Sequence, residues 1–232
     1  MPHLITSRGD SGVATFLDFA KAYDRVNRDY LFKVMEKQGF GEVFLSWIRL
    51  LYNGSVCSLM INGWAQDAIR PSRGVKQGDP LSPFLFALAL EPLGNLLRAK
   101  RGLGVDVDES LSAPVAFFED DTVLFSKRVG GLKEQLRLVD IYCDGSGAML
   151  NPAKSVIMSL NKHKTAPVLM PLRSLKNGES VKYLGIPFGN LDISTQLATQ
   201  LDEKLMTRLR LRKGRARTLM GRRLIVQAVI LP

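Results

Sequence analysis

The chain of 232 residues has 46% hydrophobic side chains, enough to bury a core in one large domain or one and a half small ones, which excludes a disordered tail. Its formal net charge of +10 favours a polyanionic partner. Two cysteines and two histidines are too few for a zinc cluster or a disulfide framework. The longest apolar run, Pro83 to Leu90, is far shorter than the roughly 20 residues that span a bilayer. We therefore expect an intracellular protein, nuclear or cytoplasmic, with no signal peptide and no transmembrane segment.

The N-terminal half alternates apolar runs with turn residues. The expected elements are a buried strand over residues 13–18, amphipathic helices over 29–38 and 42–52, and a hairpin with strands over 57–61 and 65–69. Gly39 and Gly54 are the expected ends of the two helices. Asn62-Gly63 is a typical two-residue hairpin turn. Asp18 would then lie at the end of the first strand.

The C-terminal half continues the mixture of helices and strands. The expected elements are a loop over 73–80, a helix over 82–98, strands over 115–118 and 122–125, a helix over 132–146, strands over 155–159 and 181–186, and helices over 191–211 and 222–230. Ser82 is the expected N-cap of its helix, with Pro83 at the first helical position. Because helices and hairpins interleave, we predict an α+β architecture with a mainly antiparallel sheet rather than a doubly wound parallel one.

Three acids end or interrupt apolar strands, namely Asp18, Asp120 and Asp121. A carboxylate flanked by strand-forming apolar residues is costly to desolvate unless a cation or hydrogen-bond donors compensate it. If the strands are neighbours, the acids converge as an all-oxygen ligand set, which suits Mg²⁺ or Mn²⁺. Two such ions about 3.5 to 4 Å apart support phosphoryl transfer. Alternatively, Asp18 caps a turn and the pair forms an ordinary hairpin tip.

The basic residues are concentrated near the C-terminus. Residues 204–223 hold nine Lys and Arg and no acid, which leaves the remainder of the chain at about +1. Such a stretch is either a solvated helix face or a nucleic-acid contact.

Five segments resemble, in order, the motifs of non-LTR (LINE-type) retrotransposon reverse transcriptases. They are Phe16 to Val26 (FLDFAKAYDRV), Arg73 to Leu93 (RGVKQGDPLSPFLFALALEPL), Phe117 to Phe125 (FFEDDTVLF), Gly147 to Ser155 (GAMLNPAKS) and Val181 to Gly189 (VKYLGIPFG). The resemblance implies an RNA-directed DNA polymerase that acts by two-metal nucleotidyl transfer. It implies a right-hand palm over residues 1–190, with the fingers largely missing, and a basic helical thumb-like segment over 191–232.

The resemblance also implies roles for matching positions in the nucleotide site. Asp18, Asp120 and Asp121 would be catalytic and would hold two Mg²⁺ (or Mn²⁺) ions. The other expected nucleotide-site residues are Phe19 through its carbonyl, Tyr23 beneath the incoming sugar, Gln77 and Gly78 against the nucleotide and template, and Lys154 as a proton donor to pyrophosphate. By themselves, Tyr23 would as readily be a core residue, Gly78 part of a plain turn and Lys154 a solvated lysine.

Primer and template contacts are expected further along the chain. Tyr183, Leu184 and Gly185 match the turn that holds the primer, although a core strand would also fit these residues. The thumb-like candidates for duplex contact are Arg208, Arg210, Arg212 and Lys213. The implied partners are an RNA template, a DNA primer and deoxynucleoside triphosphates.

Two departures from the family pattern weigh against full activity. Glu119 stands where a small or apolar residue usually precedes the Asp pair, so like-charge repulsion should disfavour a nearby primer phosphate. Asp18 lies so near the start of the sequence that upstream fingers motifs have no room. The alternative is therefore a catalytically inactive nucleic-acid-binding retroelement remnant. A group II intron polymerase is the neighbouring class, and a purely structural protein would require five chance motifs.

Overall fold

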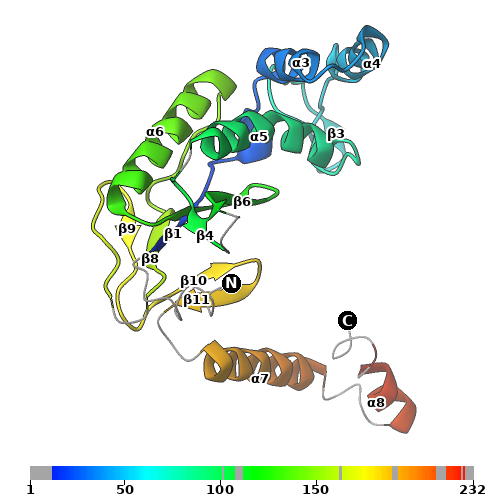
Figure 1. The fold of residues 1–232 in the computed structure, drawn as a ribbon. Helices are drawn as coiled ribbons and strands as arrows, with labels where there is room; N and C mark the ends of the chain where they lie inside the picture. The colour runs from blue at the N-terminus through cyan, green and yellow to red at the C-terminus, as the bar shows by residue number, and fades with distance from the viewer. Residues whose placement is uncertain are drawn as a thin grey trace. The chain divides into compact units, whose positions relative to one another are not determined.

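In a computed structural model of the chain, the described residues are 12–100, 102–107, 112–161, 164–189, 193–212, 218–225 and 227. The chain divides into two compact units, Met1–Leu175 and Lys176–Pro232, each of which is described by itself. Figure 1 shows the helices and strands of both units. In the described ranges, no helix combines the length and hydropathy that crossing a membrane requires.

A five-stranded sheet forms the centre of the first unit, with strand order β6-β7-β1-β8-β9. Its strands are β1 (Val13–Leu17), β6 (Val115–Phe118), β7 (Asp121–Ser126), β8 (Val156–Ser159) and β9 (Arg173–Ser174). All neighbours pair antiparallel except β8 and β9, which are parallel. The predicted α+β architecture with a mainly antiparallel sheet is thus confirmed. β1 is the central strand. Its apolar residues suit this position, where both faces of a strand are covered.

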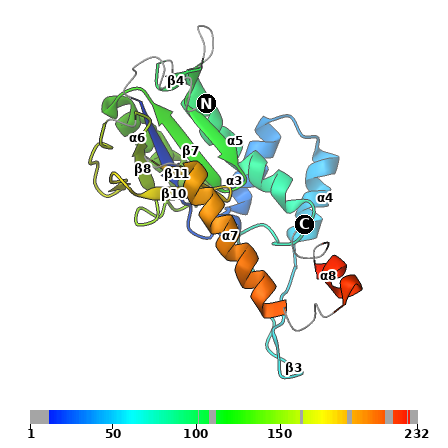
Figure 2. The same cartoon turned by 90° about the horizontal axis from the view of Figure 1, so that it is seen from below.

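Two long helices, α5 (Ser82–Ala99) and α6 (Val129–Ser146), pack on each other and on the sheet (Figures 1 and 2). Leu93 and Leu97 of α5 and Leu132 of α6 are fully buried in the core that the helices share with the strands. α6 ends at Gly147, as expected, where φ is +79°. Leu81, rather than the predicted Ser82, is the N-cap of α5.

The buried side chain of Gln135 ties α6 to β7 and to Pro114, the residue that precedes β6. Its amide nitrogen donates to the carbonyls of Pro114, at 3.1 Å, and Phe125, at 3.0 Å. Its amide oxygen accepts a hydrogen bond from the hydroxyl of Ser126. Because a buried amide without partners is costly, these bonds explain a glutamine in the core. They also show that Ser126 faces α6.

Three helices and a small hairpin precede α5, namely α2 (Ala22–Arg25), α3 (Arg28–Lys37), α4 (Glu42–Tyr52), β2 (Met60–Ile61) and β3 (Trp64–Ala65). The predictions of α3, α4 and the hairpin are confirmed. The hairpin turns at Asn62 and Gly63, which have φ of 50° and 83°. Asn27 caps α3, since its side chain accepts a hydrogen bond from the backbone N–H of Tyr30. The short elements that were not predicted include α2 and the two-residue strands β4 (Val105–Asp106) and β5 (Ser112–Ala113).

The second unit begins with a hairpin of β10 (Ser180–Tyr183) and β11 (Ile186–Gly189), followed by α7 (Ile193–Arg212) and α8 (Leu219–Ile225). The predicted single strand over 181–186 is therefore wrong. The chain reverses at Leu184 and Gly185, whose φ values are +48° and +82°. The last residues of the helix expected over 222–230 lie partly outside the described residues. The palm boundary expected after residue 190 stays a prediction, although the compact units divide at Leu175.

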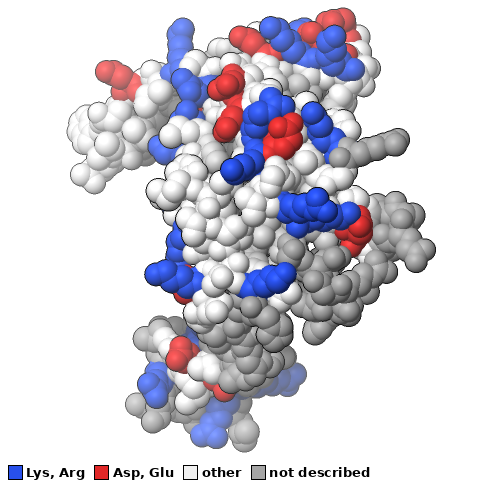
Figure 3. Space-filling model, turned by 60° about the vertical axis from the view of Figure 1, so that its left-hand side comes forward, with Lys and Arg blue, Asp and Glu red and all other residues white. Residues whose placement is uncertain are grey.

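Acidic and basic side chains are interspersed on the face drawn in Figure 3. Ion pairs of the first unit include Lys100 with Glu134 at 3.4 Å and Arg137 with Glu134 at 2.9 Å. This mixing fits the near balance of charge expected outside the basic stretch. Exposed pairs of this kind contribute little to stability.

Candidate active site

The β1 and β7 strands bring two of the predicted acids to one end of the sheet. Leu17 pairs with Thr122 in the antiparallel register. Asp18 follows Leu17 and Asp121 precedes Thr122, so the two aspartates come next to each other where the strands meet. Asp120 directly precedes Asp121, in the loop that joins β6 to β7.

The alternation of side chains along the strands puts these acids on the face away from α6. Thr122 and Ser126 of β7 are buried on the face that Ser126 shares with α6. Residues one position away in a strand point to the opposite face. Asp121 is therefore on the other face, together with Asp18, and its side chain is exposed.

Partial burial and like-charge repulsion both act on the carboxyl of Asp121 at this acidic end. Burial is the largest cause of a raised pKa of the Asp121 carboxyl. The negative charges of Asp120, Asp18 and Glu119 raise that pKa further, in that order. Because such effects fall off with distance, all three acids lie near Asp121. Glu119 itself has φ of +51°, an unfavourable conformation for a residue with a side chain.

The side chains do not form a ligand cluster as they stand. Among the residues that the structure describes, no group of three or more His, Cys, Asp or Glu side chains is placed to hold a metal ion. Like charges favour side-chain rotamers that separate them. The donor chemistry nevertheless fits a hard divalent ion, because the groups that gather here are carboxylates. The metal set of Asp18, Asp120 and Asp121 stays a prediction.

A turn near residue 150 holds the backbone around Asp18. The Asp18 N–H donates to the hydroxyl of Ser155 at 3.1 Å, and the Asn151 N–H donates to the carbonyl of Asp18 at 2.8 Å. The hydroxyl of Ser155 donates in turn to the carbonyl of Asn151 at 2.8 Å. Lys154, exposed and adjacent to Ser155, is thereby held on the turn beside Asp18. The sequence did not single out Ser155.

Phe19 also belongs to this junction. It forms an isolated antiparallel bridge with Leu150, and its side chain is buried with an edge-to-face contact to Tyr142 at 6.2 Å. The carbonyl role expected for Phe19 stays a prediction.

Three of the predicted nucleotide-site residues share one open pocket of about 440 Å³, namely Tyr23, Gln77 and Gly78. The Tyr23 ring stacks on Phe86, with centroids 4.7 Å apart and planes 10° from parallel. Burial, followed by the charges of Glu119 and Asp120, raises the pKa of the Tyr23 hydroxyl. Tyr23 thus lines the pocket and also experiences the charges of Glu119 and Asp120.

Gln77 and Gly78 lie on the loop before α5. The Gln77 amide nitrogen donates to a carboxylate oxygen of Asp24 at 3.0 Å, which orients the side chain. Gly78 has φ of +81°, a conformation that favours glycine.

The remaining candidates belong to the second unit. Tyr183 ends β10, where its ring meets that of Phe188 edge to face at 6.1 Å, and Leu184 and Gly185 form the turn that follows. Arg208 and Arg210 are exposed on α7, and Arg212 is its last residue. Lys213 lies outside the described residues.

Comparison with known proteins adds a family match. A family model described as reverse transcriptase (RNA-dependent DNA polymerase) matches residues 3–188. The chain is 29% identical, over 98% of its length, to an uncharacterized 149 kDa protein of transposon TX1 from Xenopus laevis. It is 31% identical, over 74% of its length, to the Pol polyprotein of the retrotransposable element R2DM from Drosophila melanogaster. The chain spans 18% and 17% of these two relatives.

Solved structures show the same fold at low sequence identity. Telomerase from Candida tropicalis aligns with a TM-score of 0.58 at 13% identity, over 82% of this chain and 37% of that one. Telomerase from Candida albicans, in complex with a fragment of telomeric RNA, aligns with a TM-score of 0.56 at 15% identity, over 90% of this chain and 37% of that one.

Proposed function

The chain belongs to the reverse transcriptase family, and on this premise we propose that it supplies the palm active site of an RNA-directed DNA polymerase from a retrotransposon. The proposed substrates are deoxynucleoside triphosphates, and the proposed partners are an RNA template and a DNA primer. The observation that carries the proposal is the register of β1 and β7, which brings Asp18 next to Asp121 and leaves Asp120 on the adjoining loop. Acids from distant parts of the sequence thus gather at one end of the sheet.

Reverse transcriptases as a family use divalent metal ions. In this chain, Asp18, Asp120 and Asp121 would hold two Mg²⁺ or Mn²⁺ ions, because their carboxylates are the oxygen donors at the site. Bound there, the ions would supply charge for the attacking hydroxyl and the leaving phosphate oxygen. Partial burial, and after it the charges of Asp120, Asp18 and Glu119, raises the pKa of Asp121, and a bound cation would offset both effects.

Residues around the pocket would select and orient the incoming nucleotide. Tyr23, held flat against Phe86, would lie beneath the sugar and exclude a ribose 2′-hydroxyl by its bulk. Gln77 and Gly78 would pack on the nucleotide and template, where glycine permits a close backbone approach. The backbone carbonyl of Phe19 would contribute to the same site.

Lys154 would donate a proton to the leaving pyrophosphate. Its place on the turn that is hydrogen-bonded to Asp18 supports this role.

A palm over residues 1–190 and a thumb-like segment over 191–232 would complete the arrangement. Tyr183, Leu184 and Gly185 would hold the primer strand. The basic residues of the second unit would neutralise phosphates, which gives the sequence-independent and salt-sensitive binding that a polymerase needs. The duplex-contacting candidates are Arg208, Arg210, Arg212 and Lys213.

A catalytically inactive nucleic-acid-binding protein is the second candidate. Glu119 favours it, because its charge adds to the repulsion at Asp121 and would oppose a primer phosphate.

Primer extension on an RNA template with Mg²⁺ or Mn²⁺ distinguishes the two functions. The chain should be assayed both as it stands and fused to an upstream fingers region. The polymerase proposal expects synthesis that Asp120→Asn lowers at least about 100-fold. Asp140→Asn, the same change at an exposed position of α6, is the matched control and should retain activity. Nucleic-acid binding without metal-dependent synthesis in either form would favour the second candidate.

A further inference from the structure

The loop over residues 71–77, here called the clamp loop, is held by one arginine at the start of α3. The Arg28 guanidinium donates from Nη1 to the carbonyl of Pro71 at 2.8 Å and from Nε to the carbonyl of Gly74 at 3.1 Å. Its Nη2 donates to the carbonyl of Arg73 at 3.2 Å. The guanidinium carbon also lies 5.0 Å from the centre of the Tyr52 ring. One side chain thus satisfies three backbone acceptors of the same loop.

Backbone hydrogen bonds also join the clamp loop to α2 and the residue after it. The Gly74 N–H donates to the carbonyl of Val26 at 2.8 Å, and the Val75 N–H donates to the carbonyl of Tyr23 at 2.9 Å. Gly74 has φ of +82°, and a Cβ added there would lie 2.8 Å from the carbonyl oxygen of Asp24. The clamp loop therefore lies directly against the backbone of α2, which carries Tyr23.

Lys76 fastens the far side of the clamp loop. Its ammonium donates to the carbonyl of Leu51 at 2.9 Å and lies 5.5 Å from the centre of the Tyr52 ring. The next residue, Gln77, reaches back to Asp24. The position of Gln77 in the pocket thus depends on how the clamp loop is anchored.

We propose that Arg28 is a positioning residue for the incoming nucleotide. It fixes the clamp loop so that Gln77 and Gly78 face Tyr23 across the pocket. This inference rests on the proposed polymerase function, because it assigns the pocket to a nucleotide. Arg28 itself acts through the loop.

The geometry requires arginine rather than any cation. Guanidinium presents five donors in a fixed plane, whereas the lysine ammonium is a compact point charge on a flexible stem. Lysine at position 28 would keep the charge but could not reach the three carbonyls together. Arg28→Lys should therefore loosen the clamp loop, which its other hydrogen bonds still hold in part, while α3 remains folded.

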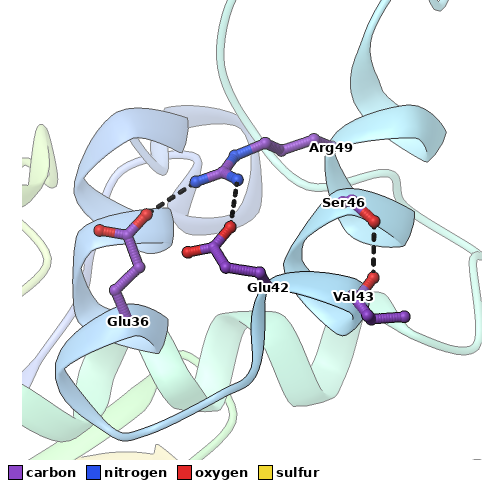
Figure 4. Close-up of polar contacts among 5 residues, drawn as sticks. All are labelled: Glu36, Glu42, Val43, Ser46 and Arg49. Atoms are coloured by element: carbon purple, nitrogen blue, oxygen red, sulfur yellow. Dashed lines mark hydrogen bonds and ion pairs between the residues drawn. The ribbon is translucent and has the colours of Figure 1, made fainter.

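Arg49 provides the matched control. Its guanidinium pairs with Glu36 at 2.7 Å and Glu42 at 3.4 Å, as Figure 4 shows, and lies 5.1 Å from the centre of the Phe32 ring. It therefore joins α3 to α4 through a guanidinium fork and a cation–π contact, as Arg28 does for the clamp loop, although its acceptors are carboxylates rather than backbone carbonyls. The acceptors of Arg49 are not on the clamp loop, so Arg49→Lys tests the loss of an arginine fork without loosening that loop.

The first measurement is steady-state primer extension by the full chain in the form that is active. For Arg28→Lys we expect the KM for the deoxynucleoside triphosphate to rise roughly tenfold, with kcat changed less than about threefold, because two or more hydrogen bonds that pre-organise the pocket are lost. Arg49→Lys should keep the KM within about twofold of the unmodified chain. An unchanged KM in Arg28→Lys would overturn the nucleotide-positioning role.

The second measurement is hydrogen exchange at the amides of Gly74 and Val75, which needs no activity. Arg28→Lys should speed their exchange at least about tenfold, and Arg49→Lys should leave it unchanged. Equal exchange in the two variants would overturn the anchoring itself. If the unmodified chain makes no DNA in any form, the proposed function fails, and the exchange rates still decide whether Arg28 anchors the loop.

Discussion

Replacing Gly74 by alanine should destabilise the first unit by about 2–5 kcal/mol, and the structure separates two contributions to that cost. The φ of +82° costs an L-residue roughly 1–2 kcal/mol. The new Cβ would also lie 2.8 Å from the Asp24 carbonyl oxygen and 2.9 Å from the Asp24 Cα. Both are backbone atoms, so they cannot move aside as the end of a flexible side chain could. Overpacking of this kind costs roughly a further 1–3 kcal/mol.

Gly39→Ala separates these contributions, because Gly39 has φ of +86° but no heavy atom within 4 Å of an added Cβ. Urea unfolding followed by circular dichroism is the assay. With a slope of about 2 kcal/mol per molar, Gly74→Ala should lower the midpoint by roughly 1–2.5 M, and Gly39→Ala by roughly 0.5–1 M. Equal midpoint shifts in the two variants would refute the close approach of the clamp loop to α2.

Three further predictions concern the acids, the turn beside them and a tyrosine. Glu119→Ala should increase primer extension, because it removes a negative charge that acts on Asp121; a rate equal to or below that of the unmodified chain would contradict this. Ser155→Ala should lower the thermal midpoint and kcat together, since it removes the acceptor of the Asp18 N–H, and an unchanged kcat would count against the turn's role. Burial raises the pKa of Tyr30 to about 12 from 10.0, so the stability that its protonated form contributes is complete below pH 10 and is lost as the pH rises toward 12. Tyr30→Phe should flatten that part of the curve of urea midpoint against pH, and an unaltered slope would show that another group titrates there.

Local patterns were sufficient for most of the helices and strands. The Asn62-Gly63 pair marks the turn of the small hairpin, and the apolar run before Asp18 marks the central strand. By contrast, residues 181–186 have the apolar pattern of a single strand. Gly185 nevertheless permits the chain to reverse, and the segment forms the ends of two strands, β10 and β11. The strands β4 and β5, which have two residues each and no typical turn pair between them, show no periodicity that a sequence could reveal.

The candidate site residues were predictable because the acids and glycines occur in the order of the family motifs. The hydrogen bonds that hold the backbone around the site were not predictable. Arg28 and Ser155 act on backbone groups that lie far away in the sequence, at Gly74 and Asp18. A lone arginine at the start of a helix and a lone serine before a strand carry no local signal of such partners, since both residue types are common on surfaces.

The place of β1 in the sheet has a consequence for how the protein folds during synthesis. Val13, near the start of the chain, pairs with Ser126 on one side and with Ser159 on the other. Both partner strands leave the ribosome long after β1 does. The backbone N–H and C=O groups of this apolar strand therefore stay unpaired until most of the first unit has been synthesised. Assembly of the acidic end should accordingly be a late event, and a nascent chain that stops before β7 should expose an aggregation-prone segment.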